Sequence, residues 1–241
     1  MRYFNVAGPC NKDDHYMIES STRLHGVEEL IAMKQYFVIH AARQSGKTTY
    51  LQDLTQRLNA EGKYYALYCS MENMQEIADP RVGIPEIVRK IKNVLRFSDI
   101  PHKAEFAREA DYENFTAVLN TVLTLFCMLL DKPLVIFFDE ADCLSEGTLI
   151  SFLRQLRDGY NSRSRIPFLH SVALVGMRNI RDFKAKVRPD SQSLGSASPF
   201  NIVTESLTLE NFSQEEIAML YGQHTADTGQ VFEPDAIKLV W

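Results

Sequence analysis

The segment covering residues 36–50, YFVIHAARQSGKTTY, most constrains what this chain can fold into. Its first four residues are aromatic, β-branched and apolar, which predicts a buried strand. The polar residues 43–49 follow and are expected to open a helix. A strand, a tight loop and a helix in this order present backbone N–H groups and the positive end of the helix to an anion. The sequence therefore predicts a site for nucleotide phosphates in this loop.

The side chains of this loop suit a nucleotide that carries a magnesium ion. Lys47 supplies a positive charge for the β- and γ-phosphates, and Thr48 offers a hydroxyl to Mg²⁺. The general pattern G-x-x-x-x-G-K-[ST] has glycine where this chain has Ala41, but that glycine only eases the exit from the strand. A chance Gly-Lys-Thr sequence in a surface loop is the alternative interpretation. The predicted phosphate-binding residues are Ala42, Arg43, Gln44, Ser45, Gly46, Lys47, Thr48 and Thr49.

A second motif, PLVIFFDEAD at residues 133–142, is a continuous apolar strand followed directly by acidic residues. Successive strand residues point to opposite sides, so Asp139 and Glu140 are expected to act differently. One of them can meet Mg²⁺ through a water molecule while the other polarises an attacking water. The alternative is that the acids cap the next helix, a role that suits Asp142.

Composition narrows the class of protein but names no function. With 241 residues, of which 45% are hydrophobic and 24% charged, the chain has room for one large α/β domain or for a domain and the start of another. The four cysteines form no C-x-x-C pair, which speaks against a zinc site or a disulfide framework. The N-terminus lacks an apolar signal core, and no apolar run is long enough to cross a bilayer. We therefore expect a soluble, cytoplasmic protein with no membrane partner.

The first 22 residues are rich in turn-forming residues and predict an extended arm. Two of its side chains, His15 and Tyr16, can lie against the adenine of a nucleotide held by the loop at residues 42–48. The alternative is that they anchor the arm to the core.

Periodicity and turn residues mark the remaining elements. The expected helices cover residues 24–34, 47–60, 84–97 and 114–130, and the expected strands cover residues 63–71, 170–176 and 201–204. Near the C-terminus, Ser213 and Glu216 form the pattern of a capping box and predict a helix, and residues 233–234 predict another.

Positive charge is concentrated in residues 154–188. This segment contains nine arginine and lysine residues and two aspartates, so its net charge is +7. The whole chain has a net charge of −5, and the rest of the chain therefore carries −12. Such a segment can offer an arginine to the nucleotide of a neighbouring subunit, or bind a nucleic-acid backbone or a protein partner. A solvated face balanced by the acidic remainder is the alternative.

With both motifs in place, the chain resembles the AAA-type ATPases of the additional-strand P-loop class. It is similar in particular to prokaryotic AAA-like ATPases with an FN-x-AGPC-x-x-x-x-HYM segment, which reads here as residues 4–10 and 15–17. The resemblance implies a three-layer α/β/α fold whose parallel sheet has the strand order 5-1-4-3-2. It divides the chain into an ATPase domain at residues 1–206, including the arm, and the start of a helical lid at 207–241. Because the lid stops inside a helical pattern, we expect the chain to be a fragment.

The resemblance also assigns roles by position. It makes Lys47 and Thr48 the Walker A pair, Asp139 the metal-binding Walker B acid and Glu140 the catalytic base. These roles imply ATP and Mg²⁺ as ligands and a slow ATPase whose nucleotide state is coupled to a partner or an attached domain. The alternative is a nucleotide-gated switch or binding module with little turnover, in STAND-type signalling or in origin-recognition-like DNA binding.

Two residues just past the strand at 170–176 are candidates for sensing the γ-phosphate. Arg178 resembles the arginine sensor of STAND-type ATPases, and Asn179 resembles the sensor of ordinary AAA members. The alternative for each is structural, with Asn179 capping a helix and Arg178 solvated. An arginine supplied by a second subunit would make the protein a homo-oligomer.

Overall fold

The computed structural model describes residues 2–19, 23–176 and 203–240. Five parallel strands form one central sheet in the order β2-β3-β4-β1-β5. The strands are β1 (Tyr36–Ala41), β2 (Tyr65–Ser70), β3 (Leu134–Asp139), β4 (Ser171–Gly176) and β5 (Val203–Leu209). Read from the other edge this order is 5-1-4-3-2, so the predicted α/β fold and topology are confirmed.

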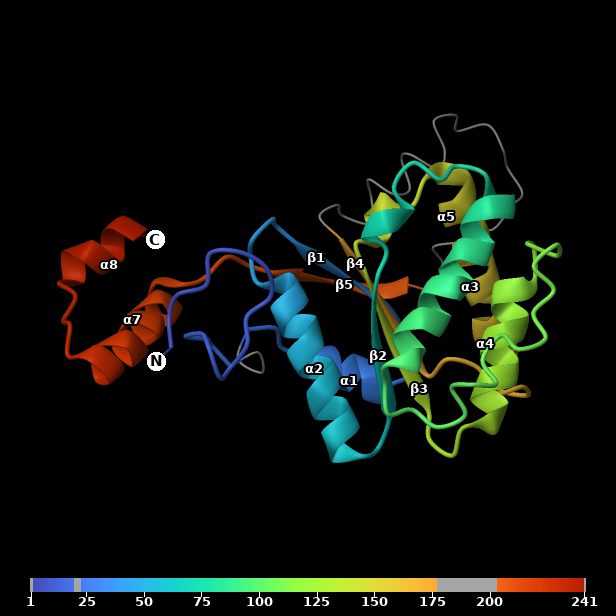
Figure 1. Cartoon of the computed structure of the whole chain (residues 1–241), viewed down its shortest axis with the longest axis horizontal. Coiled ribbons are helices and arrows are strands. Elements are labelled where there is room, and N and C mark those ends of the chain that lie inside the picture. The colour runs from blue at the N-terminus through green and yellow to red at the C-terminus, as the bar shows by residue number, and fades with distance from the viewer. Residues whose placement is uncertain (1, 20–22, 177–202, 241) are drawn as a thin grey trace.

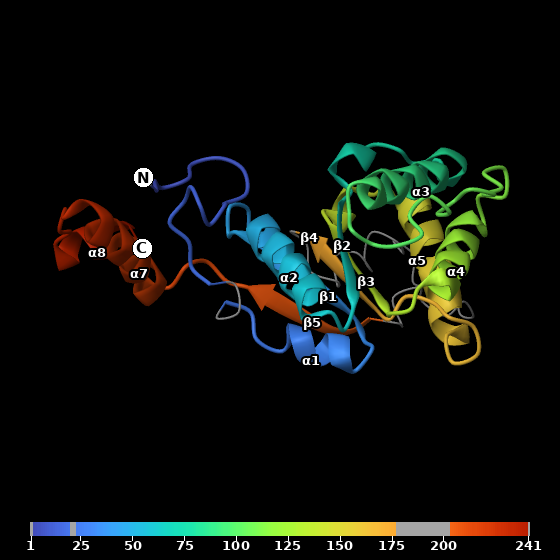
Figure 2. The same ribbon diagram turned by 60° about the horizontal axis from the view of Figure 1, so that its bottom comes forward.

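Helices cover both faces of the sheet and make a three-layer structure (Figure 1 and Figure 2). One face is covered by α1 (Val27–Ala32) and α2 (Lys47–Glu61), and the other by α3 (Pro80–Arg96), α4 (Val118–Leu129) and α5 (Glu146–Ser162). No described helix is both long enough and apolar enough to cross a membrane.

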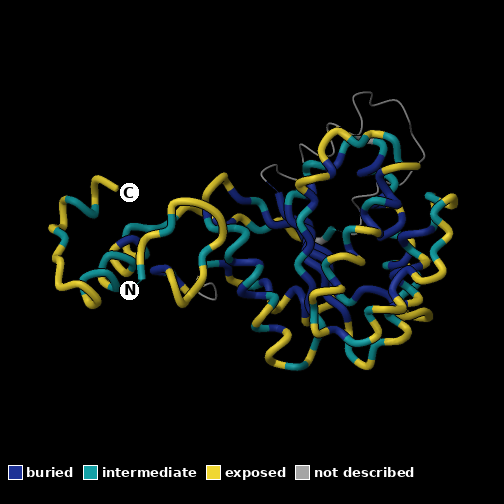
Figure 3. Tube along the Cα trace, viewed as in Figure 1, coloured by how far each residue is buried: buried dark blue, intermediate teal, exposed yellow. Residues whose placement is uncertain are grey.

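The central strands are apolar throughout because both of their faces are covered. All six residues of β3 are buried, and so are all six of β4. Alternate residues of β3 serve opposite faces: Ile136 and Phe138 pack with α3, α4 and α5, whereas Val135 and Phe137 pack with α1 and α2. In Figure 3 the buried stretches gather in the sheet and in the helices packed on it. This rigid sheet fixes the ends of β1 and β3, where both sequence motifs lie.

Helix α3 differs from its predicted range because it begins at Pro80 rather than near residue 84. Asp79 caps its N-terminus by accepting a hydrogen bond from the Arg81 backbone N–H, and proline at the first helical position loses no hydrogen bond that the helix needs. Pro85 lies inside the helix and does not end it. Helix α5 has no counterpart among the predicted elements.

The C-terminal helices lie beyond the end of the sheet, beside the N-terminal arm (Figure 1). These are α7 (Gln214–Thr228) and α8 (Pro234–Val240). The predicted capping box is present, since Ser213 Oγ accepts the Glu216 N–H and Glu216 Oε2 accepts the Ser213 N–H. Strand β5 extends through Leu209, beyond the expected strand at 201–204, of which residues 201 and 202 lie outside the described residues.

Replacing Gly83 by alanine is expected to destabilise the protein, because an added Cβ would lie 2.2 Å from Thr148 Oγ1 on α5. We expect urea denaturation to show a loss of about 1–3 kcal/mol in the free energy of unfolding, as for other overpacked cores. Gly222→Ala on α7 is the matched control, since its added Cβ meets no heavy atom within 4 Å. The control should keep stability or raise it by up to about 1 kcal/mol through helix propensity. Equal stabilities of the two variants would contradict the close packing of α3 against α5.

Candidate nucleotide and metal site

The loop between β1 and α2 has the backbone of an anion-binding site. Gln44 and Gly46 adopt left-handed backbone conformations, with φ of 61° and 82°, which turn the chain tightly into the helix. Ser45 is buried, and its hydroxyl donates to the Ala42 carbonyl at 2.9 Å. Within the described residues, the backbone N–H groups from Arg43 to Thr49 have no hydrogen-bond partner. Unpaired N–H groups at a helix N-terminus are the donors that bind phosphate oxygens.

The carboxylate of Asp139 is the centre of the site. It is 1% exposed, and Lys47 Nζ lies 3.4 Å from Oδ1 while the Thr48 hydroxyl donates to Oδ2 at 3.0 Å. Tyr68 in β2 also donates to Oδ2, at 2.9 Å, and the Glu140 backbone N–H donates to Oδ1 at 2.9 Å. The structure thus joins the two sequence motifs directly. A buried carboxylate is stable only with such partners.

Tyr68 is a member of the site that the sequence motifs miss. Burial and the nearby Asp139 carboxylate raise the pKa of its hydroxyl, so it stays protonated and donates. The only sequence signal for it is its position in a predicted strand that would end at the ligand-binding edge of a parallel sheet.

Glu140 occupies the turn that follows β3. Its backbone is left-handed, with φ of 55°, an uncommon and strained conformation for glutamate. Burial raises the pKa of the Glu140 carboxyl; Lys47 opposes this shift, and the carboxylates of Glu72, Asp139 and Asp142 reinforce it. A carboxylate with raised basicity beside a phosphate site is suited to accept a proton from water.

A second cluster connects the phosphate loop to the C-terminal helices. The Arg23 guanidinium donates to the Ser45 carbonyl at 2.5 Å and to the Glu210 carbonyl at 2.7 Å, and its Nε donates to Glu216 at 3.1 Å. It also lies over the ring of Phe212, 4.0 Å from the centroid. Its side chain is only 5% exposed, so this arginine is a buried link between the loop and α7. No sequence motif points to it.

The Arg23 link also explains why position 46 requires glycine. A Cβ on Gly46 would lie 3.2 Å from Arg23 Nη1, and the left-handed backbone there is costly for any residue with a Cβ. Gly46 therefore serves the loop conformation and the contact with Arg23 together.

A cavity of about 150 Å³ lies where the N-terminal arm, the phosphate loop and α7 meet. Tyr16 lines it, together with the ring of Phe212. His15 is placed differently: it packs edge-on against Tyr3, and its Nδ1 accepts the Asn11 N–H at 2.8 Å. The lining residues are Phe4, Asn5, Cys10, Tyr16, Met17, Ile18, Arg23, Gly46, Thr49, Tyr50, Phe212 and Leu220.

The two sensor candidates, Arg178 and Asn179, lie outside the described residues, as does the basic segment beyond residue 176. Strand β4, which they follow, pairs with both β1 and β3. In the described part of the basic segment, Arg163 is engaged by the protein itself, since it donates to the Lys34 carbonyl and lies 3.8 Å from the centroid of the Tyr160 ring.

The donor set fits a magnesium nucleotide. Free backbone N–H groups and the Lys47 ammonium suit phosphate oxygens, while the Thr48 hydroxyl and the Asp139 carboxylate are oxygen ligands of the kind that Mg²⁺ prefers. Thr48 and Asp139 are within hydrogen-bond distance of each other, so one ion can be reached by both. In the part of the chain that the structure describes, no cluster of histidine, cysteine and acidic residues offers a different metal site.

Comparison with known proteins relates the chain to ATPase structures. No protein-family model and no curated protein matches the sequence. The Walker-type ATPase PABY2304 of Pyrococcus abyssi aligns with a TM-score of 0.63 and 13% identity, over 98% of this chain and 65% of that chain. Cdc6p from Pyrobaculum aerophilum aligns with a TM-score of 0.54 and 13% identity, over 92% of this chain and 55% of that one. A chain of the Drosophila ORC complex with poly(dA/dT) DNA and Cdc6 aligns with a TM-score of 0.52 and 10% identity, over 86% of this chain and 30% of that one.

These likenesses establish the fold: the chain has the α/β architecture of the P-loop ATPases, with a five-stranded parallel sheet and helices on both faces. At such low identity they show no more than the fold. The chain spans about two-thirds of the length of PABY2304 and about half that of Cdc6p.

Replacing Arg23 by alanine is expected to loosen α7 from the phosphate loop, because Glu216 and two backbone carbonyls lose their donor. We expect the free energy of unfolding to fall by about 2 kcal/mol, and chymotrypsin, which cleaves after aromatic residues and leucine, to cut at Phe212, Leu220 or Tyr221 more readily. Arg81→Ala is the control, since that arginine pairs with Asp79 at the exposed start of α3. Wild-type protease resistance in Arg23→Ala would show that the link does not hold the helix.

Proposed function

We propose that this protein binds ATP with Mg²⁺ and hydrolyses it slowly to ADP and phosphate. The observation that carries this proposal is the convergence of Lys47 and Thr48 from one motif on Asp139 from the other, beside a loop with free N–H donors. Chance Gly-Lys-Thr and Asp-Glu sequences have no reason to meet at one buried carboxylate. The likeness to a Walker-type ATPase fold supports the same conclusion.

Each residue of the site has a role in this proposal. The N–H groups of residues 43–49 bind the phosphates, and Lys47 neutralises the charge of the β- and γ-phosphates. Thr48 and Asp139 hold Mg²⁺, which when bound shields the phosphate oxygens and orients them. Tyr68 fixes the Asp139 carboxylate by its hydrogen bond.

Glu140 is the catalytic residue of the proposed reaction. Its carboxylate orients a water for in-line attack on the γ-phosphorus and accepts a proton as the bond to the leaving ADP oxygen breaks. A water-directing glutamate directly after the metal-binding aspartate favours hydrolysis over transfer to a metabolite. We further propose that Arg178 or Asn179, which follow β4, contacts the γ-phosphate.

The base is proposed to occupy the cavity between the arm and α7. Its lining is largely apolar and includes Tyr16 and Phe212, which suits the face of a purine. Thr49 and Gly46 line the same cavity, so a nucleotide with its phosphates on the loop reaches it. In this arrangement Tyr16 contacts the base, whereas His15 stabilises the arm through contacts with other residues of the arm.

The contacts of α7 support the alternative of a nucleotide-gated switch of STAND type. Besides the Arg23 link, Arg2 of the arm pairs with Asp227, and Gln223 exchanges hydrogen bonds with the Met17 backbone. A nucleotide bound between these elements would change the position of α7, whose movement a partner or attached domain can read. In that case assembly or partner binding is the output, and hydrolysis is incidental.

The basic segment at 154–188 is proposed to bind a partner. Its net charge of +7 suits a nucleic-acid backbone, an acidic protein surface or the nucleotide of a second subunit. The Drosophila complex, which shares the fold, is bound to DNA. Binding of a DNA duplex that weakens steeply with salt would support the nucleic-acid reading, and a flat salt response would remove it. Specific activity that rises with protein concentration would indicate an arginine supplied by a second subunit.

The proposal is tested by measuring ATP affinity and phosphate release side by side in two pairs of variants. We expect Lys47→Ala to weaken ATP binding about 10- to 100-fold, because it removes charge-assisted hydrogen bonds to phosphate. Lys63→Ala, an exposed lysine just before β2, should bind like the wild type.

Glu140→Gln is expected to bind ATP normally but to release phosphate about 10²- to 10⁴-fold more slowly. Glu61→Gln, at the exposed end of α2, is its matched control. Tight ATP binding without turnover in the wild type would favour the switch. Absence of ATP binding to the wild type would refute the proposal as a whole.

A further inference from the structure

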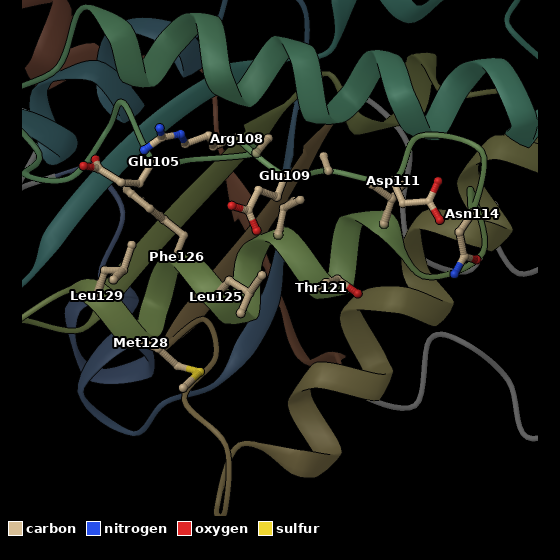
Figure 4. A pocket seen from close by; sticks show the side chains of 14 residues that line it. Glu105, Arg108, Glu109, Asp111, Asn114, Thr121, Leu125, Phe126, Met128 and Leu129 are labelled. Carbon is tan, nitrogen blue, oxygen red and sulfur yellow. The ribbon is translucent and has the colours of Figure 1, made fainter.

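A groove that the proposed nucleotide site does not use runs along helix α4. It lies between α4 and the irregular segment 105–114 that leads into it, and it has a volume of about 480 Å³ (Figure 4). In Figure 1 this helix lies at the opposite end of the molecule from the arm and α7. Whatever the groove binds is therefore separate from the phosphate loop.

The floor of the groove is apolar and open to solvent. Leu125, Met128 and Leu129 follow one face of α4 at helical spacing and are 53%, 58% and 45% exposed. Val122 and Phe126 beneath them are buried in the core, so this face is firmly supported. Three large apolar side chains at such exposure along a single helix form a patch of the kind that binds partners.

The rim of the groove is acidic. Glu105, Glu109 and Asp111 line it from the segment opposite α4, against a single basic residue, Arg108. All four are exposed, and Figure 4 shows Glu109 projecting over the apolar side chains of the helix. An apolar floor beneath a rim with a net charge of −2 selects for a ligand that is both apolar and basic.

We propose that this groove binds an amphipathic helical segment of a partner protein, with apolar residues at helical spacing and lysine or arginine along their edge. A groove that runs along a helix suits the helix-in-groove mode of recognition. A two-fold contact between two copies of this chain through the groove is disfavoured, because it would bring the two acidic rims together. The same rim repels the phosphates of a nucleic acid.

The test uses two synthetic helical peptides with the same leucines at i, i+3, i+4 and i+7. One carries lysines along the edge of the leucine stripe and the other carries glutamates. Fluorescence anisotropy with the full chain is expected to show binding of the lysine peptide at least about tenfold tighter than the glutamate peptide at low salt, with the difference shrinking as salt is added.

Matched variants locate the binding. Met128→Ser should weaken binding of the lysine peptide about tenfold, because it removes an apolar contact that the bound peptide would bury. Met33→Ser is its control, since Met33 is 56% exposed but follows α1 at a distance from the groove. Glu109→Lys should abolish the preference for the lysine peptide, whereas Glu61→Lys should keep it. Circular dichroism checks that each variant is folded, and Lys47→Ala should bind the peptide normally, which separates this proposal from the nucleotide site.

Three outcomes would overturn the proposal. The first is that the lysine peptide does not bind, or binds no better than the glutamate peptide. The second is that Met128→Ser and Met33→Ser bind it equally. The third is self-association in sedimentation velocity that Met128→Ser removes, which would make a second copy the occupant.

Discussion

The buried carboxylate of Asp139 is the interaction on which the rest of the site depends. It forms an ion pair with the Lys47 ammonium and accepts hydrogen bonds from the hydroxyls of Thr48 and Tyr68 and from the Glu140 backbone N–H. These groups come from α2, from β2 and from the turn after β3, so one side chain fixes three elements to each other. Leaving that charge unpaired in the core would be costly, which makes the arrangement a structural junction; in the proposed function it is also the place where Mg²⁺ would be held.

The arginine at position 23 extends this organisation from the sheet to the C-terminal helices. Its contacts to the Ser45 carbonyl and to Glu216 join the phosphate loop to the first turn of α7. The phosphate loop and the start of α2 are therefore contacted from two sides, by Asp139 at the sheet and by Arg23 beside α7. In the proposed switch, this link would carry the state of the nucleotide site to α7. The groove along α4 has no part in either set of contacts. The partner helix proposed to bind there would bind independently of the nucleotide.

Much of the fold could be predicted from local sequence, because both motifs follow strands whose apolar residues are buried in the core. The apolar runs at 36–39 and 134–138 are buried on both faces, so their strands, their parallel pairing and the resulting sheet order followed from pattern and resemblance. Tyr68 and Arg23 escaped prediction because their roles arise from contacts between residues far apart in the chain. Helix α3 began earlier than expected, since Asp79 caps it and Pro80 occupies the one position where proline is favourable. The sensor candidates Arg178 and Asn179 stay predictions, because they lie outside the described residues.

The most direct test is a crystal structure of the chain with a non-hydrolysable ATP analogue and Mg²⁺. We expect the phosphates to accept hydrogen bonds from the N–H groups of residues 43–49 and the Lys47 ammonium. The metal should lie between Thr48 and Asp139, and the base should lie against Tyr16. A nucleotide bound elsewhere, or a loop that stays empty at saturating analogue, would contradict the assignment of this site.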